Sequence, residues 1–173
     1  IGTGRDMNRT WGATILSRDD FLEGMSRAAQ TVSVITTDGP AGRAGVTVSA
    51  MCSVSADPPM VLACIHHQSR AVPAIRQNTV FCVNVLADTM ADVSNVFAAR
   101  TPIDDMFVAG SWQAASTGAP ALNGALASFD CRVEEIHRAG THFIFLGTVE
   151  QTMLGDGKPL IYGSRSRSEE HTS

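Results

Sequence analysis

The sequence predicts a mostly β domain with flanking helices, in which antiparallel strands form a closed or partly closed barrel. Runs of β-branched and apolar residues of strand length recur along the chain, and most are separated by turns. Helical patterns are few and do not alternate strictly with the strands, which argues against a parallel βαβ sheet. With 173 residues, the chain is long enough for one domain with a substantial core.

The first half of this domain is predicted to begin with one helix and to continue as strands. Ser17 precedes two aspartates, as is typical of a helix start, and apolar residues on one face predict a helix at about 18–29. The alternating residues 31–37 predict the first strand. Two further strands are expected at 44–55 and 60–66.

The second half is predicted to contain two short helices among further strands. The helices are expected at about 69–77, capped by Ser69, and at about 88–99, capped by Asp88 or Thr89. The remaining segments are strands at 79–86, 125–137, 142–153 and 159–162, and an irregular surface excursion at 100–124, which is rich in Gly and Pro.

The two ends of the chain differ from its centre. Residues 1–16 show no clear periodicity, so we expect a flexible arm before a single domain at 17–166. Residues 167–173, RSEEHTS, are polar and follow an apolar run abruptly. They resemble the in-frame translation of a common sequencing adapter, and we expect them to be a non-native tail.

Composition and charge exclude several classes of function. A net charge of −4 without a basic cluster argues against partners that are nucleic acids or membrane surfaces, and no apolar run is long enough to span a bilayer. The four cysteines form no C-x-x-C pair, so we expect buried reduced thiols and a cytoplasmic protein. The histidines lack zinc-site spacing, and no metal site is expected.

Three evenly spaced glycines raise the question of a phosphate-binding loop. Gly39, Gly42 and Gly45 precede a β-branched run, whereas a Walker loop or a dinucleotide fingerprint leads into a helix. We therefore expect Gly39 and Gly42 to serve a hairpin connection at positive φ.

The run after these glycines contains small and short polar residues, including Thr47, Ser49 and Ser53. Small residues would let a planar ring approach the backbone, whose N–H and C=O groups could bond its heteroatoms. An edge strand that is simply rich in Ser and Thr would show the same composition, and both interpretations remain open.

Three other features combine polar groups in ways that suit a binding site. Ser69 and Arg70 follow a strand and open a helix, which would suit a phosphate monoester, although a capped helix with a surface arginine is the commoner explanation. His142 lies in a turn between two strands, where a structural role is also commoner than a catalytic one. Asn84 in an apolar run is expected to need a specific hydrogen-bond partner. Since no nucleophile–base set or carboxylate pair is evident, any reaction would depend on a cofactor.

Five segments, taken together and in order, resemble the flavin reductase family. They are VITTDGPAGRAGVTVSAMCSVSADPP, VLACI, FCVNVL, LASFDCRVEEI and GTHFIFLGTVE, and the match runs from about residue 20 to 162. Within the family, the NADH-dependent reductases of two-component monooxygenases are the most similar group, including the pyrimidine-utilisation and 4-hydroxyphenylacetate 3-monooxygenase types.

The resemblance implies an FMN-binding split β-barrel, antiparallel and Greek-key-like, that is a homodimer with flavin near the subunit interface. It implies FMN, or FAD, as the flavin and NADH as the hydride donor, with reduced flavin passing to a monooxygenase component. The alternatives are a non-catalytic FMN-binding protein that stores or senses flavin and an enzyme similar to pyridoxamine-phosphate oxidase. The residues that match the flavin site are Thr47, Val48, Ser49, Ala50, Ser53, Ser69 and Arg70, and those near the nicotinamide are His142, as the catalytic residue, and Tyr162.

One departure from the family pattern concerns the C-terminus. Family members continue after the position of Ser166 with an aromatic-His segment that helps to cover the nicotinamide, and Arg167 and Ser168 stand there instead. We expect that restoring such a segment would lower the KM for NADH.

Overall fold

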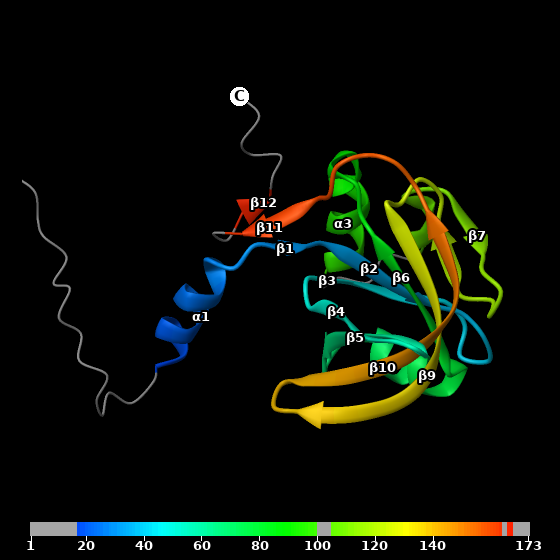
Figure 1. The fold of residues 1–173 in the computed structure, drawn as a ribbon, viewed down its shortest axis with the longest axis horizontal. Coiled ribbons are helices and arrows are strands. Elements are labelled where there is room, and N and C mark those ends of the chain that lie inside the picture. Colours follow the sequence, from blue (N-terminus) through cyan, green and yellow to red (C-terminus); the bar gives the residue numbers. More distant parts are fainter. Residues whose placement is uncertain (1–16, 100–104, 164–165, 168–173) are drawn as a thin grey trace, which may run out of the picture.

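A seven-stranded antiparallel sheet, strongly curved around a central core, forms the body of the molecule (Figure 1). The computed structural model describes residues 17–99, 105–163 and 166–167, with side chains through residue 163. The strand order in this sheet is β3-β2-β6-β9-β10-β5-β4, and no ladder joins its two end strands, β3 and β4, within the described part of the chain. The prediction of a partly closed, antiparallel split barrel is therefore confirmed.

The strands of this sheet are β2 (Ser33–Thr37), β3 (Ala44–Val48), β4 (Met51–Ala56), β5 (Pro59–His66), β6 (Val80–Val85), β9 (Ala127–Ala139) and β10 (His142–Leu154). A second, small sheet joins β1 (Gln30–Thr31), β11 (Ile161–Gly163) and β12 (Ser166–Arg167), and a third joins β7 (Trp112–Ala114) to β8 (Pro120–Leu122). The helices are α1 (Arg18–Ser26), α2 (Ala71–Asn78) and α3 (Ala91–Ala98), with 3-10 turns η1 (Asp88–Met90) and η2 (Met106–Val108).

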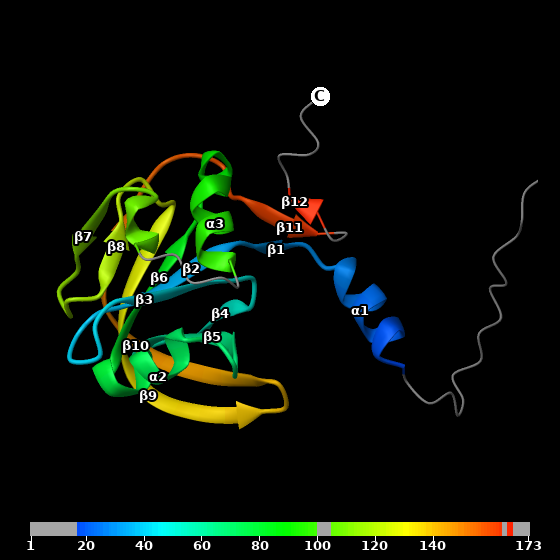
Figure 2. The ribbon, with the colours of Figure 1, turned by 180° about the vertical axis from the view of Figure 1, so that it is seen from behind.

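The core lies inside the curved sheet, where alternating residues from facing strands meet. Phe81 and Phe145 are fully buried there, with their ring centroids 6.4 Å apart. Ile35 and Ile65 belong to the same cluster, and Ile75 covers it from α2. Seen from behind in Figure 2, α2 lies against the lower part of the sheet, whereas α3 lies near the β1–β11 ribbon. The helix α1 projects from the barrel and has no buried residue.

The predicted strand at 44–55 is wrong in one respect, because the structure divides it into two strands. β3 pairs with β2, whereas β4 pairs with β5, so the chain crosses between the two ends of the sheet at Ser49 and Ala50. The Ala50 carbonyl accepts a hydrogen bond from the Cys64 N–H at 2.9 Å, which fixes the crossing against β5.

The segment predicted as an irregular excursion contains regular structure in its described part, residues 105–124. β7 and β8 form a hairpin that two buried polar residues hold against the main sheet. The Leu122 N–H donates to Asn84 Oδ1 at 2.8 Å, and the Thr117 N–H donates to the buried carboxylate of Asp130 at 2.9 Å. These contacts join residues far apart in the sequence, which is why local patterns did not indicate the hairpin.

The helix starts were predicted with mixed success. Ser17 caps α1 as expected, since its Oγ accepts from the Asp20 N–H at 3.0 Å. Ser69 is not the N-cap of α2, because that position falls to Arg70, which already has helical backbone angles. The Ser69 Oγ accepts instead from the Ala71 N–H at 3.2 Å. Neither Asp88 nor Thr89 caps α3, since both lie in the 3-10 turn that precedes it.

The ends of the predicted domain are only partly visible. The expected arm at 1–16 and residues 168–173 of the expected tail lie outside the described residues. The final predicted strand, 159–162, appears as β11, which begins two residues later and pairs with β1.

Candidate flavin and nicotinamide site

A small surface cavity of about 160 Å³ lies where the end of β3 meets β11. It brings together residues more than one hundred positions apart in the sequence. Four of its five lining residues were predicted as site residues, three for flavin and one for nicotinamide. The lining residues are Val32, Thr47, Val48, Ser49 and Tyr162.

The β2–β3 ladder positions the floor of this cavity. Thr47 lies opposite Val34 in this ladder. Its hydroxyl donates to the Ser94 carbonyl of α3 at 2.7 Å, so the side chain joins β3 to α3. Val48 is buried, and Ser49 is half-buried at the point where the strand ends. The backbone of this segment, with small side chains above it, is therefore the surface that a flat ligand would meet.

Tyr162 forms the opposite wall, from the strand predicted at 159–162, whereas its role at the nicotinamide was implied only by the resemblance. β11 pairs with β1, so that Tyr162 lies opposite Gln30, and its side chain remains exposed. Val32, which the sequence analysis missed, lines the cavity from the segment between β1 and β2. Nothing in its local pattern distinguishes it from an ordinary core valine.

Four of the seven predicted flavin residues lie outside the lining of this cavity, and two of them, Ala50 and Ser53, follow it directly along the chain. Ala50 adjoins it along the chain and is held to β5 by the hydrogen bond to Cys64. Ser53 lies further along β4, opposite Val61, and is exposed. The structure places both on the β4 side of the crossing.

A cluster of three histidines lies at the end of β5 and the start of β10. His66 and His142 are opposite each other in the ladder, with ring centroids 5.2 Å apart and an interplanar angle of 76°. The His67 ring stacks on His66 at 4.8 Å and 28°. His66 is two residues beyond Cys64 on β5, about 7 Å along a strand. The cluster is therefore close to the Ser49–Ala50 crossing, although none of its members lines the cavity.

Ser69 and Arg70, the predicted phosphate residues, follow this cluster directly. The Ser69 N–H donates to the His66 carbonyl at 2.9 Å, in a turn that leads into α2. Arg70 is exposed, and its guanidinium has no ion-pair partner among the residues that the structure describes. An exposed guanidinium without an ion-pair partner in this part of the chain is suited to an anionic group of a ligand.

Two histidines of the cluster, His142 and His67, have lowered pKa values. Partial burial, followed by the nearby His66, lowers the pKa of His142. Partial burial also lowers the pKa of His67, with smaller contributions from Arg138, His66 and His142. At neutral pH these rings therefore act as hydrogen-bonding groups without a full charge.

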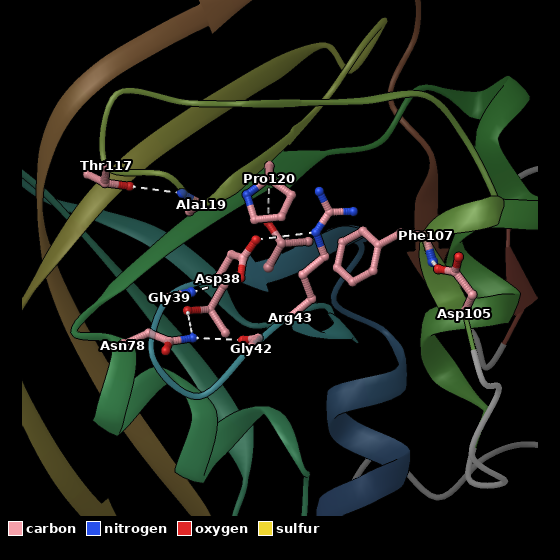
Figure 3. A network of polar contacts seen from close by, with 12 residues as sticks. Asp38, Gly39, Gly42, Arg43, Asn78, Asp105, Phe107, Thr117, Ala119 and Pro120 are labelled. Atoms are coloured by element: carbon pink, nitrogen blue, oxygen red, sulfur yellow. Dashed lines mark hydrogen bonds and ion pairs between the residues drawn. The ribbon is translucent and has the colours of Figure 1, made fainter.

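The glycine loop before β3 connects a hairpin with Gly39 and Gly42 at positive φ, as predicted. Figure 3 shows the side chain of Asn78 reaching into it, where Nδ2 donates to the Gly42 carbonyl at 3.0 Å. The Oδ1 of Asn78 accepts from the Ala41 N–H at 2.7 Å. Gly39 has a φ of 154°, and a Cβ there would lie 2.9 Å from Asn78 Oδ1, so glycine makes room for this side chain.

Arg43 at the same loop is also engaged within the protein. Its Nε donates to Asp38 at 3.3 Å, and its guanidinium lies 5.2 Å from the centre of the Phe107 ring (Figure 3).

Among the described residues, no group of three or more His, Cys, Asp or Glu side chains is arranged to hold a metal ion. No helix in the same part of the chain has the length and apolar character needed to cross a membrane.

Comparison with known proteins identifies the family of this chain. The family described as the flavin reductase like domain matches residues 25–170. A relative from Variovorax paradoxus strain S110, named FMN reductase (NADH) RutF, is 44% identical over 156 residues, covering 90% of this chain and 87% of that protein.

Solved structures are similar over most of the chain. BorF, the flavin reductase component of a bacterial two-component tryptophan halogenase, is 30% identical with a TM-score of 0.81, covering 87% of this chain and 96% of that one. A homologue of nitrilotriacetate monooxygenase component B from Mycobacterium thermoresistibile is 29% identical with a TM-score of 0.80, covering 90% and 89%. The chain belongs to the flavin reductase like domain family.

Proposed function

We propose that this protein is an NADH-dependent FMN reductase that supplies reduced flavin to a separate monooxygenase component. The observation that carries this function is the joining of the β3 end and Tyr162 in one cavity, close to the histidine cluster and Arg70. The Variovorax relative has this reductase activity in its name, and the structural relatives include reductase components of two-component oxygenases and halogenases.

The residues present fit a flavin mononucleotide. Small side chains at 48–50 leave the backbone accessible to a flat ring, and the free guanidinium of Arg70 can pair with a phosphate. When bound, FMN accepts a hydride from NADH at its isoalloxazine ring.

The protein contributes to this transfer by holding the two ligands in place. The Val48–Ser49 backbone supports one face of the flavin, and its N–H groups can stabilise negative charge on the ring without a titrating side chain. His142 and Tyr162 approach from the other strands and orient the nicotinamide. Placing the reacting atoms within roughly 3–3.5 Å of each other is the main catalytic task in such a site.

The proposal includes a homodimer with the flavin at its interface. The cavity of about 160 Å³ is smaller than the roughly 300–1,000 Å³ typical of ligand sites, so a second copy would complete it. The helix α1 also exposes Phe21 and Met25 and buries no residue in its own chain. A cytoplasmic location, where NADH and reduced cysteines are both expected, belongs to the same proposal.

The test is anaerobic oxidation of NADH with FMN, FAD and riboflavin compared at equal concentrations. We expect loss of the visible flavin absorbance, with the lowest KM for FMN. Binding of FMN without its reduction by NADH would contradict the enzymatic function and favour a protein that stores or senses flavin.

Arg70→Ala tests the phosphate contact separately. It should raise the KM for FMN about 10-fold and leave riboflavin unchanged, since hydrogen bonds to charged groups are worth about 1.5–3 kcal/mol. Arg76→Ala is the matched control, because Arg76 lies on the same helix with its guanidinium over Phe143, 4.6 Å from the ring centre. Equal effects of Arg70→Ala on FMN and riboflavin would refute the assignment of the phosphate.

A further inference from the structure

Thr141 makes two contacts at the tip of the β9–β10 hairpin that no requirement of the turn explains. Its Oγ1 is 2.8 Å from Nδ1 of His142. Its carbonyl accepts from the His67 N–H at 2.9 Å, which ties the hairpin to the segment that leads to Ser69 and Arg70. Thr141 thus fixes the ring of His142 and joins the two halves of the candidate site.

The contact to Thr141 decides which nitrogen of His142 is available to a ligand. With Nδ1 occupied, the remaining nitrogen is Nε2, which has no hydrogen-bond partner in the part of the chain that the structure describes. The ring is partly exposed, so a ligand can reach this atom.

A hydrogen bond from the backbone orients the His66 ring. Its Nδ1 accepts from the Gln68 N–H at 3.1 Å, and a backbone N–H can only donate. In this arrangement Nδ1 carries no proton, and Nε2 is the nitrogen that carries it.

The other groups around His142 also disfavour a second positive charge. His67 stacks on His66 from the segment after β5, and Arg138 on β9 places its guanidinium 5.2 Å from the centre of the Phe143 ring. The Arg138 Nε donates to the Gly140 carbonyl at 2.7 Å. On β9, Glu135 is paired with His137 at 2.9 Å and lies opposite Leu146, four residues beyond His142. Glu134, on the same strand, accepts from the Thr148 hydroxyl, further along β10.

We propose that Thr141 and His66 are positioning residues that hold His142 as a neutral imidazole, with Nε2 directed outward to hydrogen-bond the amide of the nicotinamide. Thr141 sets the orientation of the ring, and His66, directly opposite in the ladder, keeps it uncharged. This inference rests on the proposed reductase function for its ligand, but the state of the ring is a property of the protein alone.

The first test follows the imidazole protons by NMR titration in the absence of flavin and NADH. Wild-type His142 should titrate below the ordinary histidine range, because burial and, after it, the nearby His66 lower its pKa. The pKa of His142 should rise in His66→Gln, because the variant has no second imidazole that could share the positive charge at a ring distance of 5.2 Å. A His142 pKa that is the same in both proteins would overturn the role of His66. Since no ligand is present, this result does not depend on the proposed function.

The second test compares Thr141→Val with the conservative Thr141→Ser in the NADH–FMN assay. Thr141→Val should lower kcat about 3- to 10-fold, as expected for one lost hydrogen bond, and Thr141→Ser should stay within about 2-fold of the wild type. FMN affinity and melting temperature should be unchanged in both. An unchanged kcat in Thr141→Val, or an equal loss in Thr141→Ser, would overturn the role of the hydroxyl.

The pH profile provides a readout that a purely structural role would not move. Protonation of His142 should reduce kcat/KM for NADH as pH falls through its pKa, and this acid limb should lie at higher pH in His66→Gln. An acid limb at the same pH in both proteins would contradict the proposal. Failure of wild-type protein to reduce FMN at all would instead refute the reductase function and leave the titration result intact.

Discussion

Replacing Asn84 by Leu should cost this protein a large share of its stability. Asn84 is fully buried, and its amide makes four hydrogen bonds to three different strands. Its Nδ2 donates to the Val34 carbonyl and to Thr36 Oγ1, both at 3.1 Å. Its Oδ1 accepts from the Leu122 N–H and from Ser128 Oγ, both at 2.8 Å.

The size of the effect follows from the groups that the leucine would leave unsatisfied. The Leu122 N–H and the Val34 carbonyl would lose their partner in a buried environment, at about 1–3 kcal/mol each. The Thr36 hydroxyl loses one donor but keeps its own hydrogen bond to the Pro120 carbonyl, and the Ser128 hydroxyl can rotate to another acceptor, so both add less. We therefore expect the free energy of unfolding to fall by about 3–5 kcal/mol, out of a total of about 5–15 kcal/mol for a typical domain.

Urea unfolding measures this loss with two signals. Circular dichroism follows the main sheet, and tryptophan fluorescence includes Trp112, which lies opposite Leu122 in the β7–β8 hairpin. In Asn84→Leu the fluorescence transition should come before the transition in circular dichroism, because the hairpin loses its anchor first. Ser128→Ala, which removes one donor to the same oxygen, is the control and should cost about 1 kcal/mol. A loss below about 1 kcal/mol in Asn84→Leu would refute the reasoning.

Two further predictions concern buried positions of the barrel. Alkylation with iodoacetamide at about pH 8, followed by mass spectrometry, should show modified Cys52, which is exposed, and unmodified Cys131. The reason is that burial, with Asp130 nearby, raises the pKa of the Cys131 thiol to about 12. Equal labelling of the two cysteines would contradict this prediction. In thermal melts, Gly147→Ala should lower the stability of the protein by about 1–3 kcal/mol, because the new Cβ would lie 2.5 Å from Phe81 Cζ. Gly24→Ala is the control: no atom lies near that position on α1, so this variant should not destabilise the protein.

Most of the strands and helices could be predicted because their signals are local. The cap at Ser17 and the β-branched run at 31–37 both involve neighbours in the sequence. The structure confirms the cap, and it confirms the strand for residues 33–37, whereas Thr31 belongs to β1 of another sheet. The break at Ser49–Ala50 could not be predicted, because it depends on which distant strand each half joins. The cap at Ser69 failed for a different reason: the residue lies in a turn closed by His66, so the helix begins after Arg70.

The candidate site was predictable in its parts and less so in its assembly. The small and short polar residues of the run that includes Thr47, Val48 and Ser49 indicated a possible ligand surface. Only the resemblance to the flavin reductase family connected this run to Tyr162, which lies on another sheet. His66 and His67 were visible in the sequence beside Ser69, yet their contact with His142 depends on the register of β5 with β10. A register of this kind is set by the whole sheet and has no local signature.

The strand that carries Ser53 also bears on how the protein behaves at high concentration. Within the described chain β4 forms a ladder with β5 alone, and such an open edge is a template for the strands of other molecules, which can lead to aggregation. A register shift between Ser53 and Ser55 introduces a bulge into this edge, and Pro58 and Pro59 interrupt the chain directly after it. The bulge and the two prolines therefore make β4 a poor seed for fibrils.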